Sequence, residues 1–288
     1  MKILITGSNG FIGQAVTERL RKRHKVFTLG RDRQQDYCCD LRQEQQVRRI
    51  GQTFKAKKID FIIHLASVIC TPQNRTQISL LEENLLMTKN MIVLAQMVKP
   101  KAFIHASSIA MYPQQNGTYS EKSVVNMSGN GDGLYGLAKF NAEVLLNFFL
   151  SSTMKVVHLR VAQVIGPLMR EDRIIPMMLK ELKEKNTITV FGNGERVVNF
   201  IHVRDVARAF EKISVSPKPG SFNVGCRKHW TILAIAKELA RQYGNKDTKI
   251  IKVPQGSRIK QYIDTNLLKE TYAFEADTLD LSSKGLNV

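Results

Sequence analysis

A tyrosine and a lysine four residues apart are the first candidates for chemistry in this chain. Tyr135 and Lys139 stand in the stretch YGLAK, and this spacing on a helix places both side chains on one face. An ordinary tyrosine, with a pKa of about 10, is a weak base near neutral pH. A neighbouring ammonium group would favour the phenolate. The pair therefore indicates acid–base chemistry.

A serine at the end of a strand adds a third candidate. Ser107 and Ser108 end the apolar stretch KAFIHASS. The carboxyl edge of an open parallel sheet is where such folds bind ligands, so the hydroxyl of Ser108 could hydrogen-bond a substrate carbonyl or alcohol. For Ser107, ordinary turn chemistry is the preferred interpretation.

Three glycines near the start of the chain predict where the cofactor binds. Gly7, Gly10 and Gly13 lie where a short apolar strand turns into a helix-length segment, and Phe11 and Ile12 stand between the last two glycines. Such a turn brings backbone N–H groups and a helix N-terminus against a pyrophosphate, where side chains would collide. The loop, with Phe11 and Ile12, therefore predicts a dinucleotide site.

The end of the second strand indicates which dinucleotide. The stretch KVFTLGRD has Gly30 where NAD-binding chains usually carry an acid, and Arg31 follows it. A guanidinium without a carboxylate suits a 2′-phosphate, so NADP is the expected cofactor and NAD the second candidate. The alternative is that Arg31 is an ordinary surface arginine and that Asp32, one residue later, holds the ribose.

A parallel sheet is needed to position these residues. Strand-like runs alternate with helix-length segments over the first 165 residues, which predicts an α/β fold with a Rossmann-like, doubly wound parallel sheet. We expect residues 1–165 to form the dinucleotide-binding domain, with part of 192–228 returning to it. Residues 166–191 and 229–288 would form a smaller C-terminal substrate-binding lobe.

The composition is that of a soluble globular protein. Of its 288 residues 43% are hydrophobic and 24% charged, and neither the four cysteines nor the six histidines have metal-ligand spacing. We expect a reduced, cytoplasmic protein without a secretion signal, a membrane segment or a metal. The net charge of +18, concentrated in stretches such as RLRKRHK, could attract nucleic acid. A solvated basic face is the preferred interpretation, so nucleic acid is not expected as a partner.

The order of the motifs resembles that of the extended short-chain dehydrogenases/reductases, also called the NAD-dependent epimerase/dehydratase family. The resemblance spans nearly the whole chain and rests on TGSNGFIG, CDL, HLAS, ENLLMTKN, SSIAMY, YGLAK, LRVAQVIGP, FGNGERVVNFIHVRDVA and FNVG. Most members transfer a hydride between a nicotinamide and a nucleotide-linked sugar. The resemblance therefore implies a nucleotide-sugar reductase or epimerase, and Arg31 favours the reductase because cells keep NADP mostly reduced.

The same resemblance implies roles for individual residues. Ser108, Tyr135 and Lys139 would be the catalytic set, and Lys139 would also hold the nicotinamide ribose. Further cofactor contacts would come from Asp40, Leu41, Leu65, Ala66 and Ser67.

Two residues after the serine depart from one branch of the family. Sugar dehydratases carry a Thr-Asp-Glu set, where this chain has Ser108, Ile109 and Ala110. Since neither Ile109 nor Ala110 can exchange a proton, we expect that the protein is not a 4,6-dehydratase.

The substrate contacts also depart from the family pattern. Val198 stands where many members have a phosphate-contacting arginine, and Arg196 would point to the same face of a strand. Either Arg196 substitutes for it or the substrate lacks the usual diphosphate. Arg258 is a second candidate for a phosphate contact. Gln163 could hydrogen-bond the substrate or be a buried structural amide.

Two helix-length segments suggest a homodimer, because residues 80–98 and 135–150 match a pair that often forms a four-helix interface in the family. Phe148, Phe149 and Leu150 would supply apolar contacts, although core packing explains them nearly as well. A second function also stays open: a non-catalytic NAD(P)-binding protein with an RNA- or protein-binding role. The high charge invites it, and the intact catalytic set opposes it.

Overall fold

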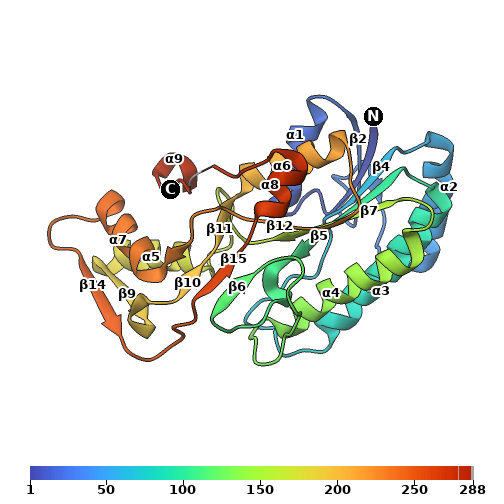
Figure 1. The fold of residues 1–288 in the computed structure, drawn as a ribbon. Helices are drawn as coiled ribbons and strands as arrows, with labels where there is room; N and C mark the ends of the chain where they lie inside the picture. Colours follow the sequence, from blue (N-terminus) through green and yellow to red (C-terminus); the bar gives the residue numbers. More distant parts are fainter. Residues whose placement is uncertain (278, 287–288) are drawn as a thin grey trace.

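The computed structural model describes residues 1–277 and 279–286, and its centre is a parallel sheet of seven strands (Figure 1). Their order is β12-β7-β5-β4-β1-β2-β3. The strands are β1 (Lys2–Thr6), β2 (Lys25–Gly30), β3 (Tyr37–Cys38), β4 (Phe61–His64), β5 (Ala102–Ser108), β7 (Lys155–Val161) and β12 (Gly220–Val224). Because the order reverses between β1 and β4, the prediction of a doubly wound, Rossmann-like sheet is confirmed.

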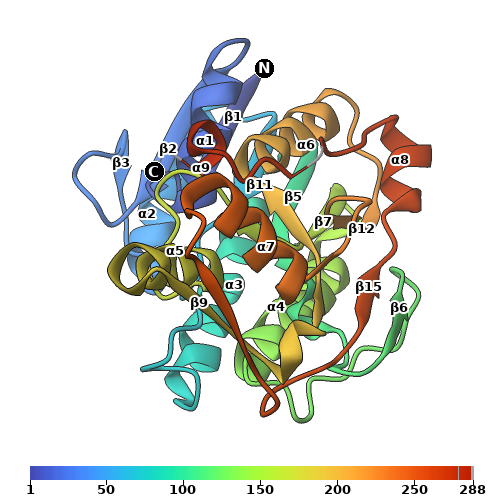
Figure 2. The ribbon, with the colours of Figure 1, turned by 90° about the vertical axis from the view of Figure 1, so that its left-hand side faces the viewer.

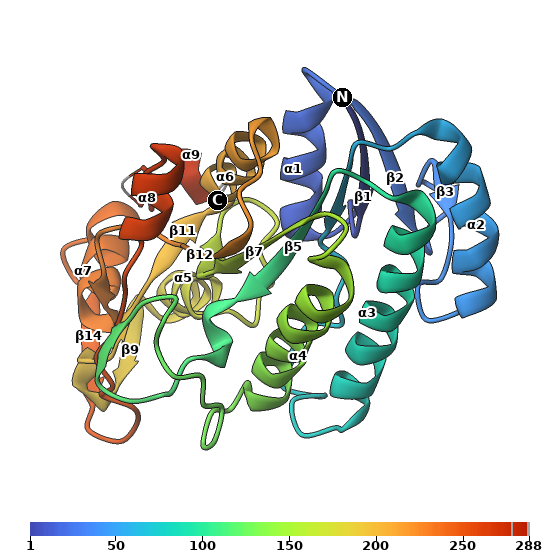
Figure 3. The same cartoon turned by 45° about the vertical axis from the view of Figure 1, so that its right-hand side comes forward.

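Helices cover both faces of this sheet (Figure 3). One face packs against α2 (Glu44–Lys57), α3 (Ser79–Val98) and α4 (Gly133–Leu150), and the other against α1 (Phe11–Arg21) and α6 (Val203–Val215). Successive side chains of a strand point to opposite faces, so Ile3 and Ile5 join the core under α1, while Leu4 joins the core under α3. Burial on both faces explains the continuous apolar runs of the strands.

A third apolar cluster lies in the C-terminal part of the chain. Figure 2 shows α5 and α7 beside β9, with this part of the molecule facing the viewer. Its elements are α5 (Ile174–Lys185), β9 (Thr187–Phe191), η2 (Gly192–Gly194), β10 (Val197–Val198), β13 (Trp230–Thr231), α7 (Ile232–Tyr243) and β14 (Lys249–Val253). Their buried side chains form a core separate from the two that flank the sheet. The domain boundaries given above stay a prediction.

Short elements connect the two parts of the molecule. They are η1 (Ile109–Met111), β6 (Gly117–Tyr119), β8 (Gln163–Ile165), β11 (Phe200–His202), β15 (Gln261–Ile263), α8 (Asn266–Tyr272) and α9 (Ser283–Leu286). β8 pairs with β11, and β6 pairs with β15 from far along the chain. None of the described helices is both long and apolar enough to pass through a membrane.

The basic stretch that follows Glu18 lies at the end of α1. Arg19 forms an ion pair of 2.6 Å with Glu211 on the neighbouring helix α6. Arg21 stands in the last turn of α1, where a positive charge is favourable to the helix dipole. Part of the positive charge therefore serves the packing and termination of a helix.

Candidate active site

The glycine loop joins β1 to α1 at the point where the strand order reverses. Gly7 has a left-handed φ of 74°, and a Cβ placed there would lie 2.5 Å from the backbone nitrogen of Ala66. A Cβ on Gly13 would lie 2.0 Å from the carbonyl oxygen of Gly7. Both positions therefore need glycine, because the backbone after β1 lies directly against the backbone after β4 and against the first turn of α1.

The N-terminus of α1 is open to an anion. Gly10 occupies the cap position without a side-chain hydrogen bond, and the first turn, which begins with Phe11 and Ile12, carries no acidic residue. The first N–H groups of a helix have no partner within the helix, and they carry a partial positive charge. This end of α1 fits the pyrophosphate of a dinucleotide.

The loop that follows β4 forms the other wall of the candidate cofactor site. Leu65, Ala66 and Ser67 are half-buried there. The Ala66 N–H faces the hydroxyl of Thr6 at 3.4 Å, and the Ser67 hydroxyl donates to Oδ1 of Asn84 at 2.8 Å. The structure thus brings these three residues together with the glycine loop.

The segment after β2 folds back onto the glycine loop. Asn9 donates to the carboxylate of Asp32 at 3.0 Å, and the Ser8 hydroxyl hydrogen-bonds the side chain of Gln35. Arg31 is exposed. Two residues are candidates for the ribose end of the cofactor, Arg31 and Asp32. Because Asp32 accepts a hydrogen bond from Asn9, Arg31 is the better placed of the two to bind a ligand.

Asp40 and Leu41 are placed less favourably for a cofactor. The guanidinium of Arg42 bonds the Asp40 carboxylate at 2.7 Å and also reaches Glu83, and it holds the pKa of Asp40 below its ordinary value. The Leu41 side chain is buried in the core beneath α3, and its carbonyl accepts from Asn90 at 2.8 Å. Their adenine contact stays a prediction.

Tyr135 and Lys139 share one face of α4, as their spacing predicts. The ammonium nitrogen lies 5.6 Å from the centre of the tyrosine ring and donates a hydrogen bond of 2.9 Å to the carbonyl of Ala106. Lys139 is 5% exposed, and burial lowers its pKa to about 8. The amine of Lys139 is therefore about half protonated near pH 8.

The pKa of Tyr135 differs from the expectation drawn from Lys139. Burial raises it to about 12, and the opposing effects of Ser67 and of the charge of Arg173 are smaller. The physical reason is that desolvation of the phenolate outweighs its neighbours, while the Lys139 ammonium turns toward a backbone carbonyl. Without a bound cofactor, Tyr135 is thus a proton donor at neutral pH.

Ser108 lies beside the start of α4. Its hydroxyl accepts a hydrogen bond of 3.1 Å from the N–H of Ala110 and caps η1. That short helix packs closely on α4, because a Cβ on Gly136 would lie 2.5 Å from the Ala110 carbonyl oxygen. The hydroxyl can still donate its own hydrogen to a substrate oxygen.

Two of the four predicted substrate contacts, Arg196 and Arg258, lie on neighbouring segments. The N–H of Val197 donates to the carbonyl of Ile259 at 2.9 Å. The residues that precede this pair, Arg196 and Arg258, therefore lie on segments that run next to each other. Arg196 is half-buried, and its pKa is lowered by burial, with Asp132 acting in the opposite direction.

Gln163 and Arg258 are both exposed. Gln163 begins β8, so the alternative of a buried structural amide is not what the structure shows. Arg258 donates to the carbonyl of Pro254 at 3.2 Å.

Sequence reasoning missed a group of residues around Tyr135. Cys70 donates from Sγ to the Asp132 carboxylate at 3.2 Å, and Arg170 donates to the Cys70 carbonyl at 3.0 Å. The charge of Arg173 reaches Tyr135. No motif marks these residues, because they come from three loops that only the fold brings together.

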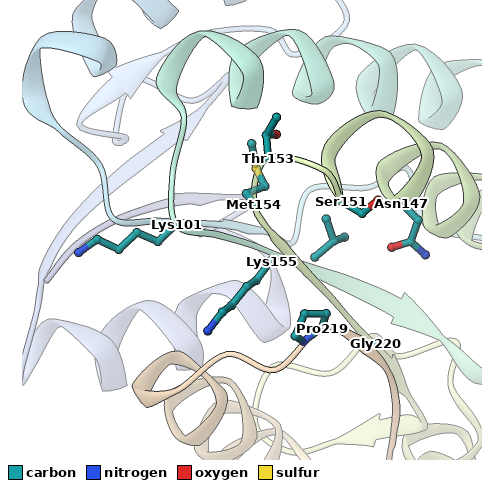
Figure 4. Close-up of a pocket in the computed structure, with 9 residues that line it drawn as sticks. Lys101, Asn147, Ser151, Thr153, Met154, Lys155, Pro219 and Gly220 are labelled. Atoms are coloured by element: carbon teal, nitrogen blue, oxygen red, sulfur yellow. The ribbon is translucent and has the colours of Figure 1, made fainter.

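A separate pocket lies at the opposite edge of the sheet (Figure 4). It has a volume of about 450 Å³ and is lined by the starts of β7 and β12 and by the end of α4, including Lys155, Gly220 and Asn147. Because these are the amino ends of the strands, this pocket is not the candidate cofactor site.

Comparison with known proteins agrees with this geometry. A profile described as "NAD dependent epimerase/dehydratase family" matches residues 3–225. The UDP-glucose 4-epimerase of Thermotoga maritima, solved with UDP-glucose, superposes with a TM-score of 0.82 over 99% of this chain and 96% of that chain at 22% identity. The UDP-glucuronic acid 4-epimerase of Bacillus cereus, solved with UDP-glucuronic acid and NAD, gives 0.81 over 100% and 97% at 22% identity.

One expectation is corrected by a relative. A Dictyostelium discoideum protein named dTDP-D-glucose 4,6-dehydratase is 26% identical over 269 residues, which span 83% of this chain and 61% of that protein. The exclusion of the dehydratases, drawn from Ile109 and Ala110, was therefore wrong. The expectation rested on only two positions, whereas the similarity to this relative extends over 269 residues.

Proposed function

The chain belongs to the NAD-dependent epimerase/dehydratase family, and from this premise we propose that it transfers a hydride between a nicotinamide dinucleotide and a nucleotide-linked sugar, with Tyr135 as the proton donor and acceptor. The observation that carries the proposal is the position of Tyr135 and Lys139 on one face of α4, beside Ser67 in the wall of the candidate cofactor site. No comparison supports the alternative of a non-catalytic protein.

The chain's own residues have distinct tasks in this reaction. Gly7, Gly10 and Gly13 would hold the dinucleotide at the N-terminus of α1, and its nicotinamide supplies or accepts the hydride when bound. The Ser108 hydroxyl orients the sugar oxygen by donating to it, and the Tyr135 phenol gives that oxygen its proton. A hydride on carbon and a proton on oxygen together turn a carbonyl into an alcohol.

Reduction is the direction that the site favours. A phenol with a pKa of about 12 is fully protonated at neutral pH, so it starts the cycle as a donor. Exposed Arg31 beside Gly30 supports NADP, the dinucleotide that cells keep mostly reduced.

Positive charge at the site supports an anionic substrate. Arg196 is half-buried within reach of the charge of Asp132, and the charge of Arg173 reaches Tyr135. A guanidinium removed from water is stabilised by an anion such as a diphosphate. We assign Arg196 and Arg258 to the diphosphate of the nucleotide and Gln163 to the sugar.

Exposed apolar side chains on α3 and α4 support a homodimer. Phe148 is 80% exposed, and Leu85, Leu86, Val144 and Phe149 are exposed as well. The two helices lie side by side on the outside of the molecule (Figure 3). Leu150, by contrast, is fully buried, so it belongs to the core and not to this surface.

The test is a product assay with UDP-, dTDP- and GDP-linked keto sugars and with the reduced forms of NADP and NAD. Net oxidation of the nicotinamide together with a new sugar alcohol is the expected result. Turnover of a sugar without net change in the nicotinamide would contradict the reductive direction, and no turnover with any pair would contradict the proposal as a whole.

A further inference from the structure

The side chain of Gln35 lies over the last residue of β2. That strand ends at Gly30, the position where NAD-binding chains usually carry an acidic residue. A Cβ placed on Gly30 would lie 3.4 Å from Cγ of Gln35, 3.7 Å from its Cδ and 3.9 Å from its Oε1. A carboxamide from later in the same loop therefore stands beside the place of the missing carboxylate.

The Gln35 carboxamide also contacts the glycine loop. Its Oε1 accepts a hydrogen bond from the hydroxyl of Ser8, the residue after Gly7. Ser8 is 5% exposed, so its hydroxyl has little access to water and Gln35 supplies the acceptor that it needs. The amide thus lies between the end of β2 and the glycine loop. Dinucleotide-binding folds of this kind hold the ribose of the adenosine half there.

The backbone is held on both sides of Gln35. The carboxylate of Asp36 accepts from the N–H and the hydroxyl of Thr28 at 2.9 and 3.0 Å, and the same hydroxyl accepts from the N–H of Asp36 at 2.9 Å. The N–H of Gln35 donates to the carbonyl of Asp32 at 3.1 Å, and the Asp32 side chain accepts from Asn9 at 3.0 Å. These bonds give the Gln35 side chain a defined position against the glycine loop.

The hydrogen bond from Ser8 decides which half of the amide faces a ligand as a donor. Because Oε1 is occupied by the hydroxyl, Nε2 keeps both of its hydrogens, and no hydrogen bond between described residues uses that nitrogen. An amide nitrogen donates, whereas a carboxylate only accepts. A carboxylate suits the 2′-hydroxyl of NAD, and a donor suits the 2′-phosphate of NADP.

The charges around the loop also suit a phosphate. Asp36 forms an ion pair of 3.5 Å with Arg21, and the carboxylate of Asp32 already accepts a backbone N–H at 2.9 Å. Arg31 and Arg33 are exposed on the same loop. Since both carboxylates already have donors, the two exposed guanidinium groups give the loop a positive surface.

We propose that Gln35 determines a preference for NADP over NAD, because its Nε2 donates to the 2′-phosphate where NAD-binding chains use a carboxylate to accept from the 2′-hydroxyl. The Ser8 hydroxyl is a positioning group, since it occupies Oε1 and leaves Nε2 as the group that meets the ligand. This inference rests on the proposed function in one respect, namely that the glycine loop binds a nicotinamide dinucleotide. It depends neither on the sugar nor on the direction of hydride transfer.

The test compares two glutamines of the same loop. Gln35→Glu replaces the donor by a carboxylate of nearly the same size. Gln34→Glu introduces the same charge at the neighbouring position, where the glutamine is exposed. Calorimetric titration gives the dissociation constants of NADP and NAD for the wild type and both variants.

In Gln35→Glu the affinity for NADP is expected to fall by about tenfold or more, because a hydrogen bond to a charged group is lost and a like charge is introduced. The affinity for NAD should stay at the wild-type value or rise, since the new carboxylate can accept from the 2′-hydroxyl. In Gln34→Glu the ratio of the two affinities should stay within about twofold of the wild-type ratio, because an exposed charge is screened.

Three results would overturn the proposal. They are a wild type that binds NAD more tightly than NADP, an unchanged ratio of affinities in Gln35→Glu, and equal changes of that ratio in both glutamate variants. The last result would mean that any negative charge on the loop acts in the same way.

A pair of smaller ligands separates this inference from the proposed function. Adenosine 2′,5′-bisphosphate and AMP differ only in the 2′-phosphate and contain no nicotinamide. The wild type is expected to bind the bisphosphate more tightly, and Gln35→Met, which keeps the length of the side chain without its donor, should reduce that difference by about fivefold or more. Equal affinities for both ligands in the wild type, or an undiminished difference in Gln35→Met, would overturn it. Failure of every sugar assay with this difference intact would count against the proposed function alone.

Discussion

Lys139 lies under Tyr135, with its ammonium nitrogen 5.6 Å from the centre of the phenol ring and 2.9 Å from the carbonyl oxygen of Ala106. The helix thus supplies two groups whose pKa values are moved apart by burial, to about 12 for the phenol and about 8 for the amine. In this state the site holds its transferable proton on Tyr135.

The low pKa of Lys139 predicts a dependence of stability on pH. Since the pKa in the folded protein, about 8, lies below the unfolded value of about 10.4, the unfolded chain binds more protons between these limits and stability rises with pH. Relative to Lys139→Met, the wild type should gain about 1 kcal/mol in free energy of unfolding between pH 7 and pH 9. Urea unfolding of both proteins at the two pH values measures it, and parallel pH dependences would refute it.

The glycine loop predicts the effect of a single methyl group. Gly13→Ala should destabilise the protein by about 1–3 kcal/mol and weaken dinucleotide binding, because the new Cβ would meet the Gly7 carbonyl oxygen. Gly131→Ala is the matched control, since nothing lies within 4 Å of a Cβ at that position. Calorimetric titration with NADP and NAD checks the binding, and equal affinities in the two variants would disprove the account of the loop.

Arg31 predicts the preference between the two dinucleotides. Arg31→Ala should weaken NADP binding by about tenfold or more and leave NAD binding nearly unchanged, because a hydrogen bond to a charged phosphate is lost. Arg33→Ala, also at an exposed arginine of the same loop, is the control. If both variants keep the wild-type ratio of affinities, Arg31 is an ordinary surface residue.

Phe148 predicts the oligomeric state. Phe148→Asp should convert a dimer into a monomer in analytical ultracentrifugation, because a charge would be buried in an apolar interface. Val215→Asp, at another exposed apolar residue, should leave the sedimentation unchanged. A wild-type protein that sediments as a monomer would remove the basis for this interface.

Local sterics made the first part of the site predictable from the sequence. The loop with Gly7 and Gly13 needs glycine wherever a strand turns this tightly into a helix, and the spacing of Tyr135 and Lys139 fixes their common helix face without any tertiary information. The alternation of strands and helices likewise specified the parallel sheet.

Tertiary register made the rest unpredictable. His64 ends β4, whereas His105 and His158 stand in the middle of β5 and β7, and only the pairing of these strands aligns the three residues. The pairing of β6 with β15 is too short for a pattern and joins distant parts of the chain. The pKa of Tyr135 depends mainly on its burial, which cannot be deduced from its spacing to Lys139 in the sequence.

Transfer of deuterium tests the central claim most directly. Reduced NADP deuterated at the transferable position is incubated with the panel of nucleotide-linked keto sugars, and the sugar product is analysed by mass spectrometry for wild type and for Tyr135→Phe. The wild type should place deuterium on the sugar carbon, and Tyr135→Phe should do so about 10²–10⁴ times more slowly while still binding NADP. Deuterium transfer at the same rate in both proteins, or in neither, would contradict the role of Tyr135.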